Sequence, residues 1–186
     1  MKSLKTIQVL AKIAKIICTV LFIVCIVGAS CCALSVIILP VTKDVILYED
    51  KTFSVVLAEQ GTSYIDALTG SVIGLIVCGV GIFLAKYTEL FFKKELELGT
   101  PFDKGLVKDM RKMALIHIIV SIVASIITSI VYFIFKESVP DFNGTYDFNG
   151  GSIGFGISML IISLFCDYGA EKANDVIEAE EVEETL

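Results

Sequence analysis

The sequence contains no tryptophan and a single histidine, and charged side chains are missing from four long apolar stretches. Only 19% of the 186 residues are charged, whereas 55% are hydrophobic. This composition is typical of a membrane protein and argues against an ordinary soluble domain. The missing charge also disfavours a coupled transporter, because a proton or ion pathway usually needs an ionisable side chain inside the membrane.

The sequence also lacks the patterns that mark common enzymes. It has no phosphate-binding glycine loop, no zinc-protease helix and no paired carboxylates at a membrane face. Serines, cysteines and His117 are present, but no third group is placed to orient a catalytic base. We therefore expect no enzyme activity, no cofactor and no metal site.

Four charge-free runs are long enough to test against a bilayer core of about 30 Å, which a helix of about 20 residues crosses. They cover residues 16–39, 67–85, 113–135 and 148–166. The second and fourth runs are shorter and contain glycines, so their flanks or neighbouring helices would complete the span. The expected fold is an all-α membrane protein, a bundle of four transmembrane helices in one domain.

The first run has two competing interpretations. Lysines precede it and small residues follow at Gly28, Ala29 and Ser30, as in a secretory signal peptide, and Cys31 allows a lipoprotein site. The apolar run continues to Leu39, well past either cleavage point. This continuation favours an uncleaved first span.

The placement of lysine and arginine predicts the orientation. Four lysines precede the first run and seven basic residues lie within 86–112, whereas the two remaining loops hold three. The positive-inside rule therefore places both termini and the central segment in the cytoplasm, with the protein in the plasma membrane. The acidic tail, 167–186, then lies on the side of the basic segment. It either folds back onto that segment or stays solvated.

The two outer loops have different patterns. Residues 40–66 contain two runs rich in β-branched and aromatic side chains, separated by Glu49, Asp50 and Lys51, which predicts a short β-hairpin. Residues 136–151 are rich in turn formers, and Asn143 begins a glycosylation triplet. We expect both loops mainly to connect helices.

The segment between the second and third runs predicts a helix end followed by a helix start. Gly99 suits the end of one helix, and Thr100 suits the cap of the next, with Pro101 at its first position. Basic residues that follow would reach anionic headgroups. We call residues 99–112 the elbow and predict that it forms a cytoplasmic docking face. Its candidate residues are Gly99, Thr100, Pro101, Phe102, Lys104, Lys108, Arg111 and Lys112.

Small and hydroxyl-bearing residues predict where the helices touch, since they permit close approach and hydrogen bonds in lipid. The candidate bundle interface consists of Gly70, Gly74, His117, Ser121, Ser125 and Ser129, with Thr128 on an adjoining stripe. A proton or metal role for His117 is conceivable, but a neutral histidine bonded to a neighbouring helix is the preferred interpretation. All six cysteines lie in the apolar runs, and Cys18, Cys25 and Cys32 share a helix face, which predicts helix packing.

Two segments carry a family resemblance. The first contains Gly99, Pro101, Phe102, Val107, Met110, Arg111 and Lys112, and the second contains Phe165, Tyr168, Gly169 and Glu171. Together they resemble a family of uncharacterised four-span prokaryotic membrane proteins. Asp103 and Lys172 depart from the family pattern, which more often has a hydroxyl residue and a leucine there. The resemblance implies a helical bundle in the plasma membrane of a bacterium or archaeon, often encoded beside a small helix-turn-helix regulator.

Two function classes remain open at this stage. The first is an interaction or regulatory partner whose elbow and acidic tail form a cytoplasmic docking face for the small regulator, with no direct contact to nucleic acid. The second is an oligomeric component of small-molecule export or of membrane protection, such as an immunity protein. The charge-free spans favour the first class over transport.

Overall fold

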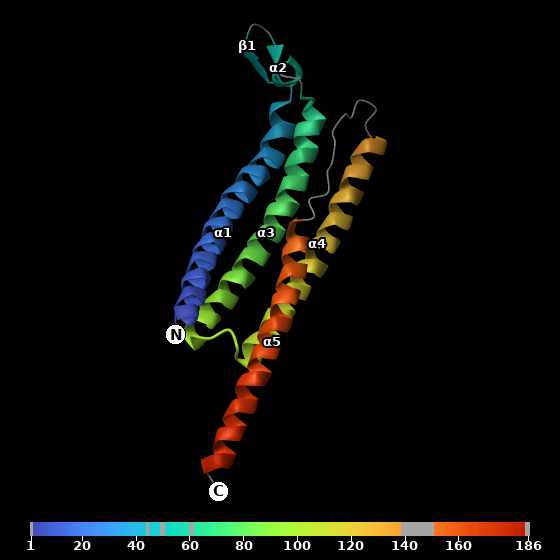
Figure 1. The fold of residues 1–186 in the computed structure, drawn as a ribbon. Helices are drawn as coiled ribbons and strands as arrows, with labels where there is room; N and C mark the ends of the chain where they lie inside the picture. The colour runs from blue at the N-terminus through green and yellow to red at the C-terminus, as the bar shows by residue number, and fades with distance from the viewer. Residues whose placement is uncertain (1, 44, 49–50, 60–61, 139–150, 185–186) are drawn as a thin grey trace. The chain divides into compact units, whose positions relative to one another are not determined.

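Four long helices contain most of the chain in the computed structural model, which describes residues 2–43, 45–48, 51–59, 62–138 and 151–184 (Figure 1). The helices are α1 (Lys2–Thr42), α3 (Tyr64–Leu98), α4 (Lys104–Ser138) and α5 (Gly151–Glu184). Each is long and apolar enough to cross a membrane. The chain is therefore an all-α, multi-pass membrane protein, as the sequence predicts.

The helices are longer than the apolar runs that predict them. The 35 residues of α3 rise about 52 Å, well beyond the ~30 Å hydrocarbon core. The predicted start of the fourth run at residue 148 lies outside the described residues, and α5 begins at Gly151. Because α5 continues to Glu184, the backbone of the predicted acidic tail is helical as far as that residue.

The connection between α1 and α3 contains the predicted hairpin in a shortened form. Strand β1 (Ile46–Tyr48) pairs antiparallel with β2 (Lys51–Thr52). The second apolar run was expected to be a strand, but it forms helix α2 (Phe53–Glu59) instead. With only three residues in β1, no strand partner remains for this run, and a helix satisfies its backbone groups internally. Residues 139–150 of the connection between α4 and α5, including Asn143, lie outside the described residues.

The described chain divides into two compact units, each considered by itself below. The first unit comprises Met1–Val20, Leu84–Ser121 and Gly150–Leu186, and the second comprises Leu21–Phe83 and Ile122–Asn149. The first unit thus contains all of α5, together with the beginning of α1, the end of α3 and the first half of α4. It also contains the elbow.

The core of the first unit is built around one face of α4. Leu106 and Met113 are fully buried, and Val107, Met110 and Ala114 lie on the same face. Their spacing of three and four residues is that of a helix stripe. Phe91 of α3 and Met159 and Cys166 of α5 complete the cluster, so the apolar spacing predicted for α4 is confirmed.

In the second unit, α1 and α3 meet through cysteines packed on glycines. A Cβ atom added to Gly81 would lie 2.7 Å from Sγ of Cys25, and one added to Gly74 would lie 2.8 Å from Sγ of Cys32. Between them, Gly28 faces Cys78 at 3.0 Å. The contacts advance along α1 as they recede along α3, as antiparallel helices require. Packing is confirmed for Cys25, Cys32 and Cys78, whereas Cys31 is exposed, and all six thiols are free.

Candidate functional site

The elbow begins with a glycine in a left-handed conformation. Gly99 has a φ of 72°, and its N–H donates to the carbonyl oxygen of Glu95 at 3.0 Å, which ends α3 as predicted. The side-chain amide of Gln8 donates to the carbonyl oxygen of Gly99, also at 3.0 Å. The start of α1 is therefore tied directly to the elbow.

The cap of α4 differs from the sequence prediction. Thr100 was expected to cap the helix, but α4 begins at Lys104 and Asp103 is the cap. Oδ1 of Asp103 accepts from the N–H of Leu106 at 2.9 Å. Thr100 instead accepts from the N–H of Phe102 at 3.3 Å, within a local turn. Asp103 caps the helix in preference to Thr100 because a carboxylate is a strong hydrogen-bond acceptor and its negative charge complements the positive end of the helix dipole.

The two segments that carry the family resemblance contact each other in the first unit. Pro101 is buried, whereas Phe102 is 41% exposed. A Cβ atom added to Gly169 of α5 would lie 2.9 Å from Cδ1 and Cε1 of the Phe102 ring. The ring therefore packs directly against the α5 backbone, and a side chain at position 169 would have to displace it.

The basic residues of the elbow separate into two sets. Lys104, Lys108 and Lys112 are exposed and recur every four residues on α4, and we call them the lysine stripe. Arg111 instead pairs with Asp167 of α5, with Nη2 and Oδ2 2.5 Å apart. Asp167 is the first residue of the predicted acidic tail, so one tail residue contacts the elbow. The side chains beyond Lys172 lie outside the described residues.

His117 lies where α3, α4 and α5 of the first unit meet, and its ring is buried. Nδ1 donates to the carbonyl oxygen of Met113 at 2.9 Å, because a carbonyl only accepts. Nε2 lies 3.1 Å from the hydroxyl of Thr88 on α3. The Phe155 ring of α5 is 5.0 Å away between centroids. The predicted bond from His117 to a neighbouring helix is confirmed.

The serine stripe of α4 is only partly buried. Ser121 is buried and its hydroxyl has no hydrogen-bond partner among the described residues, but Ser125 is half-buried and Ser129 is exposed. Steps of four residues turn about 40° beyond a full helical turn, so the stripe drifts away from the buried face. Thr128, 1% exposed, lies on that face instead. Likewise, a Cβ at Gly70 would meet nothing within 4 Å, unlike one at Gly74.

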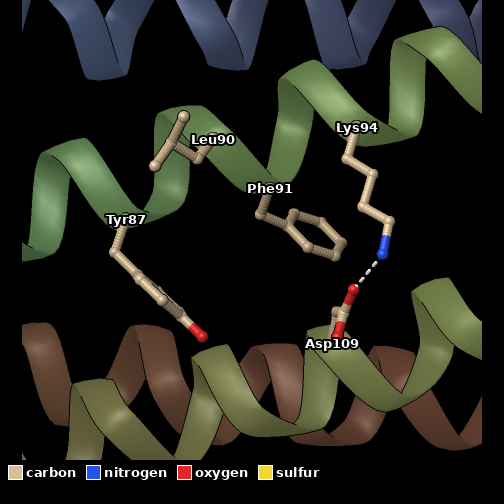
Figure 2. A pocket seen from close by; sticks show the side chains of 5 residues that line it. All are labelled: Tyr87, Leu90, Phe91, Lys94 and Asp109. Atoms are coloured by element: carbon tan, nitrogen blue, oxygen red, sulfur yellow. Dashed lines mark hydrogen bonds and ion pairs between the residues drawn. The ribbon is translucent and has the colours of Figure 1, made fainter.

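A groove in the first unit was not anticipated from the sequence. It has a volume of about 200 Å³ and is lined by Tyr87, Leu90, Phe91 and Lys94 of α3 and by Asp109 of α4 (Figure 2). Figure 2 shows the Lys94 ammonium and the Asp109 carboxylate paired across the groove. The sequence does show a lysine before the elbow and an aspartate within it, but the 15 residues between them give no sign that they pair.

The comparisons with known proteins leave the function to be argued from the chain itself. The chain matches no protein-family model, no curated protein and no solved structure. Among the described residues, no three His, Cys, Asp or Glu side chains are grouped so that they could hold a metal ion. The geometry that stands out is a constrained elbow with an exposed aromatic ring and lysines.

Proposed function

We propose that this protein lies in a prokaryotic plasma membrane with both termini in the cytoplasm and acts as a non-enzymatic interaction or regulatory partner. Its docking face consists of Phe102 and the lysine stripe. The observation that carries the proposal is that Phe102, Lys104 and Lys108 are exposed on an elbow whose backbone is held in place. Aromatic anchors beside charged groups are a common composition of binding surfaces.

Four contacts hold the elbow in one conformation. They are the left-handed turn at Gly99, the bond from Gln8, the cap by Asp103 and the seat of Phe102 on Gly169. A surface that is already ordered loses less conformational entropy when a partner binds. This preorganisation favours docking over a merely connecting role for the segment.

The lysine stripe extends from the lipid surface into the cytoplasm. Lys112 adjoins the third apolar run, whereas Lys108 and Lys104 lie about 7 and 13 Å before it along α4. The headgroup layer is only about 5 to 8 Å thick on each side. Lys112 therefore serves as a lipid anchor, while Lys104 and Phe102 reach beyond the headgroups and are available to a protein.

The partner we propose is a small helix-turn-helix regulator. This choice is supported by the family resemblance at Gly99, Pro101, Phe102 and Gly169, which belong to two segments that contact each other. Such a regulator would need an acidic patch, because complementary charge steers association and fixes the register of an interface. Binding at the membrane would withhold the regulator from DNA.

Photocrosslinking from the elbow tests this proposal. A photoreactive amino acid replaces Lys104, and a matched one replaces Leu115, which is exposed on the same helix inside the apolar run. We expect Lys104, but not Leu115, to capture a DNA-binding regulator, and Lys108→Glu to reduce the yield. Capture of lipid alone from both positions would refute the docking role. Capture of only further copies of the chain would favour the oligomeric export or membrane-protection alternative.

A further inference from the structure

The groove between α3 and α4 has an apolar floor and a charged end. Tyr87, Leu90 and Lys94 follow one another by three and four residues and so share a face of α3, with Phe91 beside them. Leu90 is 52% exposed although it is fully apolar, and the Lys94 and Asp109 side chains are 50% and 35% exposed. The groove is thus open to its surroundings along both its apolar and its charged parts.

The groove lies at the depth of lipid headgroups. Asp109 comes four residues before the third apolar run, which places it about 6 Å from the hydrocarbon along α4. Tyr87 comes two residues after the second run, at the level where aromatic side chains gather in membrane proteins. Leu90, Phe91 and Lys94 follow at about 7 to 13 Å from that run along α3, so the groove leads from the edge of the hydrocarbon at Tyr87 through the headgroup layer to its outer side.

The charges at the end of the groove match a zwitterion. Lys94 and Asp109 neutralise each other, so the site does not favour a simple anion, which the Asp109 carboxylate would repel. A molecule with a phosphate and an ammonium group satisfies both side chains, since the phosphate binds Lys94 and the ammonium binds Asp109. Such charge-assisted hydrogen bonds are stronger than neutral ones.

We propose that this groove is a binding site for a phospholipid with a primary ammonium headgroup, of the phosphatidylethanolamine class. The glycerol backbone and the first methylene groups lie along Leu90 and Phe91, and the acyl chains continue past Tyr87 into the hydrocarbon. The headgroup exchanges the Lys94–Asp109 pair for two pairs with the lipid. A phosphatidylcholine headgroup is disfavoured because its methylated nitrogen has no N–H to donate to Asp109. A phosphatidylglycerol headgroup is disfavoured because it offers Asp109 no cation. This site is independent of the docking role of the elbow.

Lipid retention by the full-length protein tests the site. The protein is reconstituted with equal amounts of phosphatidylethanolamine, phosphatidylcholine and phosphatidylglycerol, extracted gently, and examined by native mass spectrometry. We expect phosphatidylethanolamine to be retained about three- to tenfold over each of the others, as one charge-assisted contact would give. Equal retention of the three lipids would overturn the proposal.

Variants assign the preference to the groove. Asp109→Asn is expected to abolish the preference for ethanolamine, whereas Lys94→Gln is expected to lower retention of all three lipids and keep their order. The matched control is Glu97→Gln, which removes the same charge from an exposed pair with Lys93 outside the groove and should change nothing. A preference that survives Asp109→Asn in folded protein, or that Glu97→Gln also abolishes, contradicts the assignment.

A soluble headgroup distinguishes a lipid from a free phosphate compound. If the apolar floor contributes, phosphoethanolamine without acyl chains should not displace the bound lipid at equal concentration. Leu90→Gln should reduce lipid retention without altering the headgroup order. Displacement by the soluble compound would show that the groove binds the headgroup alone and would contradict a lipid site.

Discussion

Phe102 of the elbow rests on Gly169 of α5, so closely that a Cβ atom at Gly169 would lie 2.9 Å from two ring carbons. The two residues are 67 positions apart in the sequence, by the difference of their numbers. This contact joins the α3–α4 connection to the last helix within the first unit. It gives Gly169 a steric role and supports the conformation of the proposed docking face.

Replacing Gly169 by alanine should therefore destabilise the protein. The added methyl must displace the Phe102 ring, and overpacking of this kind costs about 1–3 kcal/mol, which outweighs the gain of up to about 1 kcal/mol in helix propensity. Gly154→Ala is the matched control in the same helix, because its Cβ would meet nothing within 4 Å. That control should gain up to about 1 kcal/mol from helix propensity. The free energy of unfolding in mixed micelles measures both, and equal stabilisation would disprove the contact.

The packing of α1 on α3 in the second unit predicts that one substitution restores stability lost through another. Gly81→Ala forces a methyl against Sγ of Cys25 and should cost about 1–3 kcal/mol, whereas Gly79→Ala, in open space, should gain up to about 1 kcal/mol from helix propensity. Adding Cys25→Ala removes the sulfur and should recover part of the loss. A double-mutant cycle measures the coupling, and a coupling near zero would show that the pair does not touch.

The cap of α4 predicts unequal effects of two neighbouring substitutions. Asp103→Ala removes the acceptor for the N–H of Leu106 and should lower stability by about 0.5–2 kcal/mol. Thr100→Ala removes only a 3.3 Å bond in an exposed turn and should have a much smaller effect. Thermal unfolding of both variants provides the comparison. A larger loss of stability for Thr100→Ala would show that Thr100 caps the helix, as the sequence suggested.

The bond between Thr88 and His117 should stabilise the packing of α3 on α4. Thr88→Val keeps the shape but removes the hydroxyl that Nε2 of His117 faces, and a buried unsatisfied group costs about 1–3 kcal/mol. Thr42→Val is the control, since among the described residues its hydroxyl bonds to carbonyl oxygens of its own helix, those of Ile38 and Leu39. Denaturation in mixed micelles compares the variants. Similar losses in the two would argue against a role for the cross-helix bond.

The sequence predicted the features that depend on local pattern. The four charge-free runs correctly predicted the four long helices, because length and apolarity alone decide which segments can span a membrane. Gly99 correctly predicted the end of α3, because few residues other than glycine adopt the left-handed backbone conformation found there. The seven-residue spacing of Cys25 and Cys32 correctly predicted a packed helix face, because seven residues make almost two full helical turns.

Two local predictions were wrong, and two contacts between distant residues were missed. Asp103 caps α4 instead of Thr100, a choice between two acceptors three residues apart that the pattern does not resolve. Ser129 was placed on the buried face because a four-residue step was followed too far along the helix, where Thr128 is buried instead. The groove pair Lys94–Asp109 and the seat of Phe102 both join helices across the elbow, and neither is encoded in local spacing.

Cysteine labelling on intact cells tests the inward-facing elbow most directly, because a docking face for a regulator must lie in the cytoplasm. Single cysteines replace Lys104 in the elbow and Val55 in α2, both exposed, and the native chain gives the background from cysteines in apolar runs. A membrane-impermeant maleimide should label the cysteine at position 55 from outside and the one at position 104 only after permeabilisation. Labelling of position 104 on intact cells, with protection of position 55, would contradict the account.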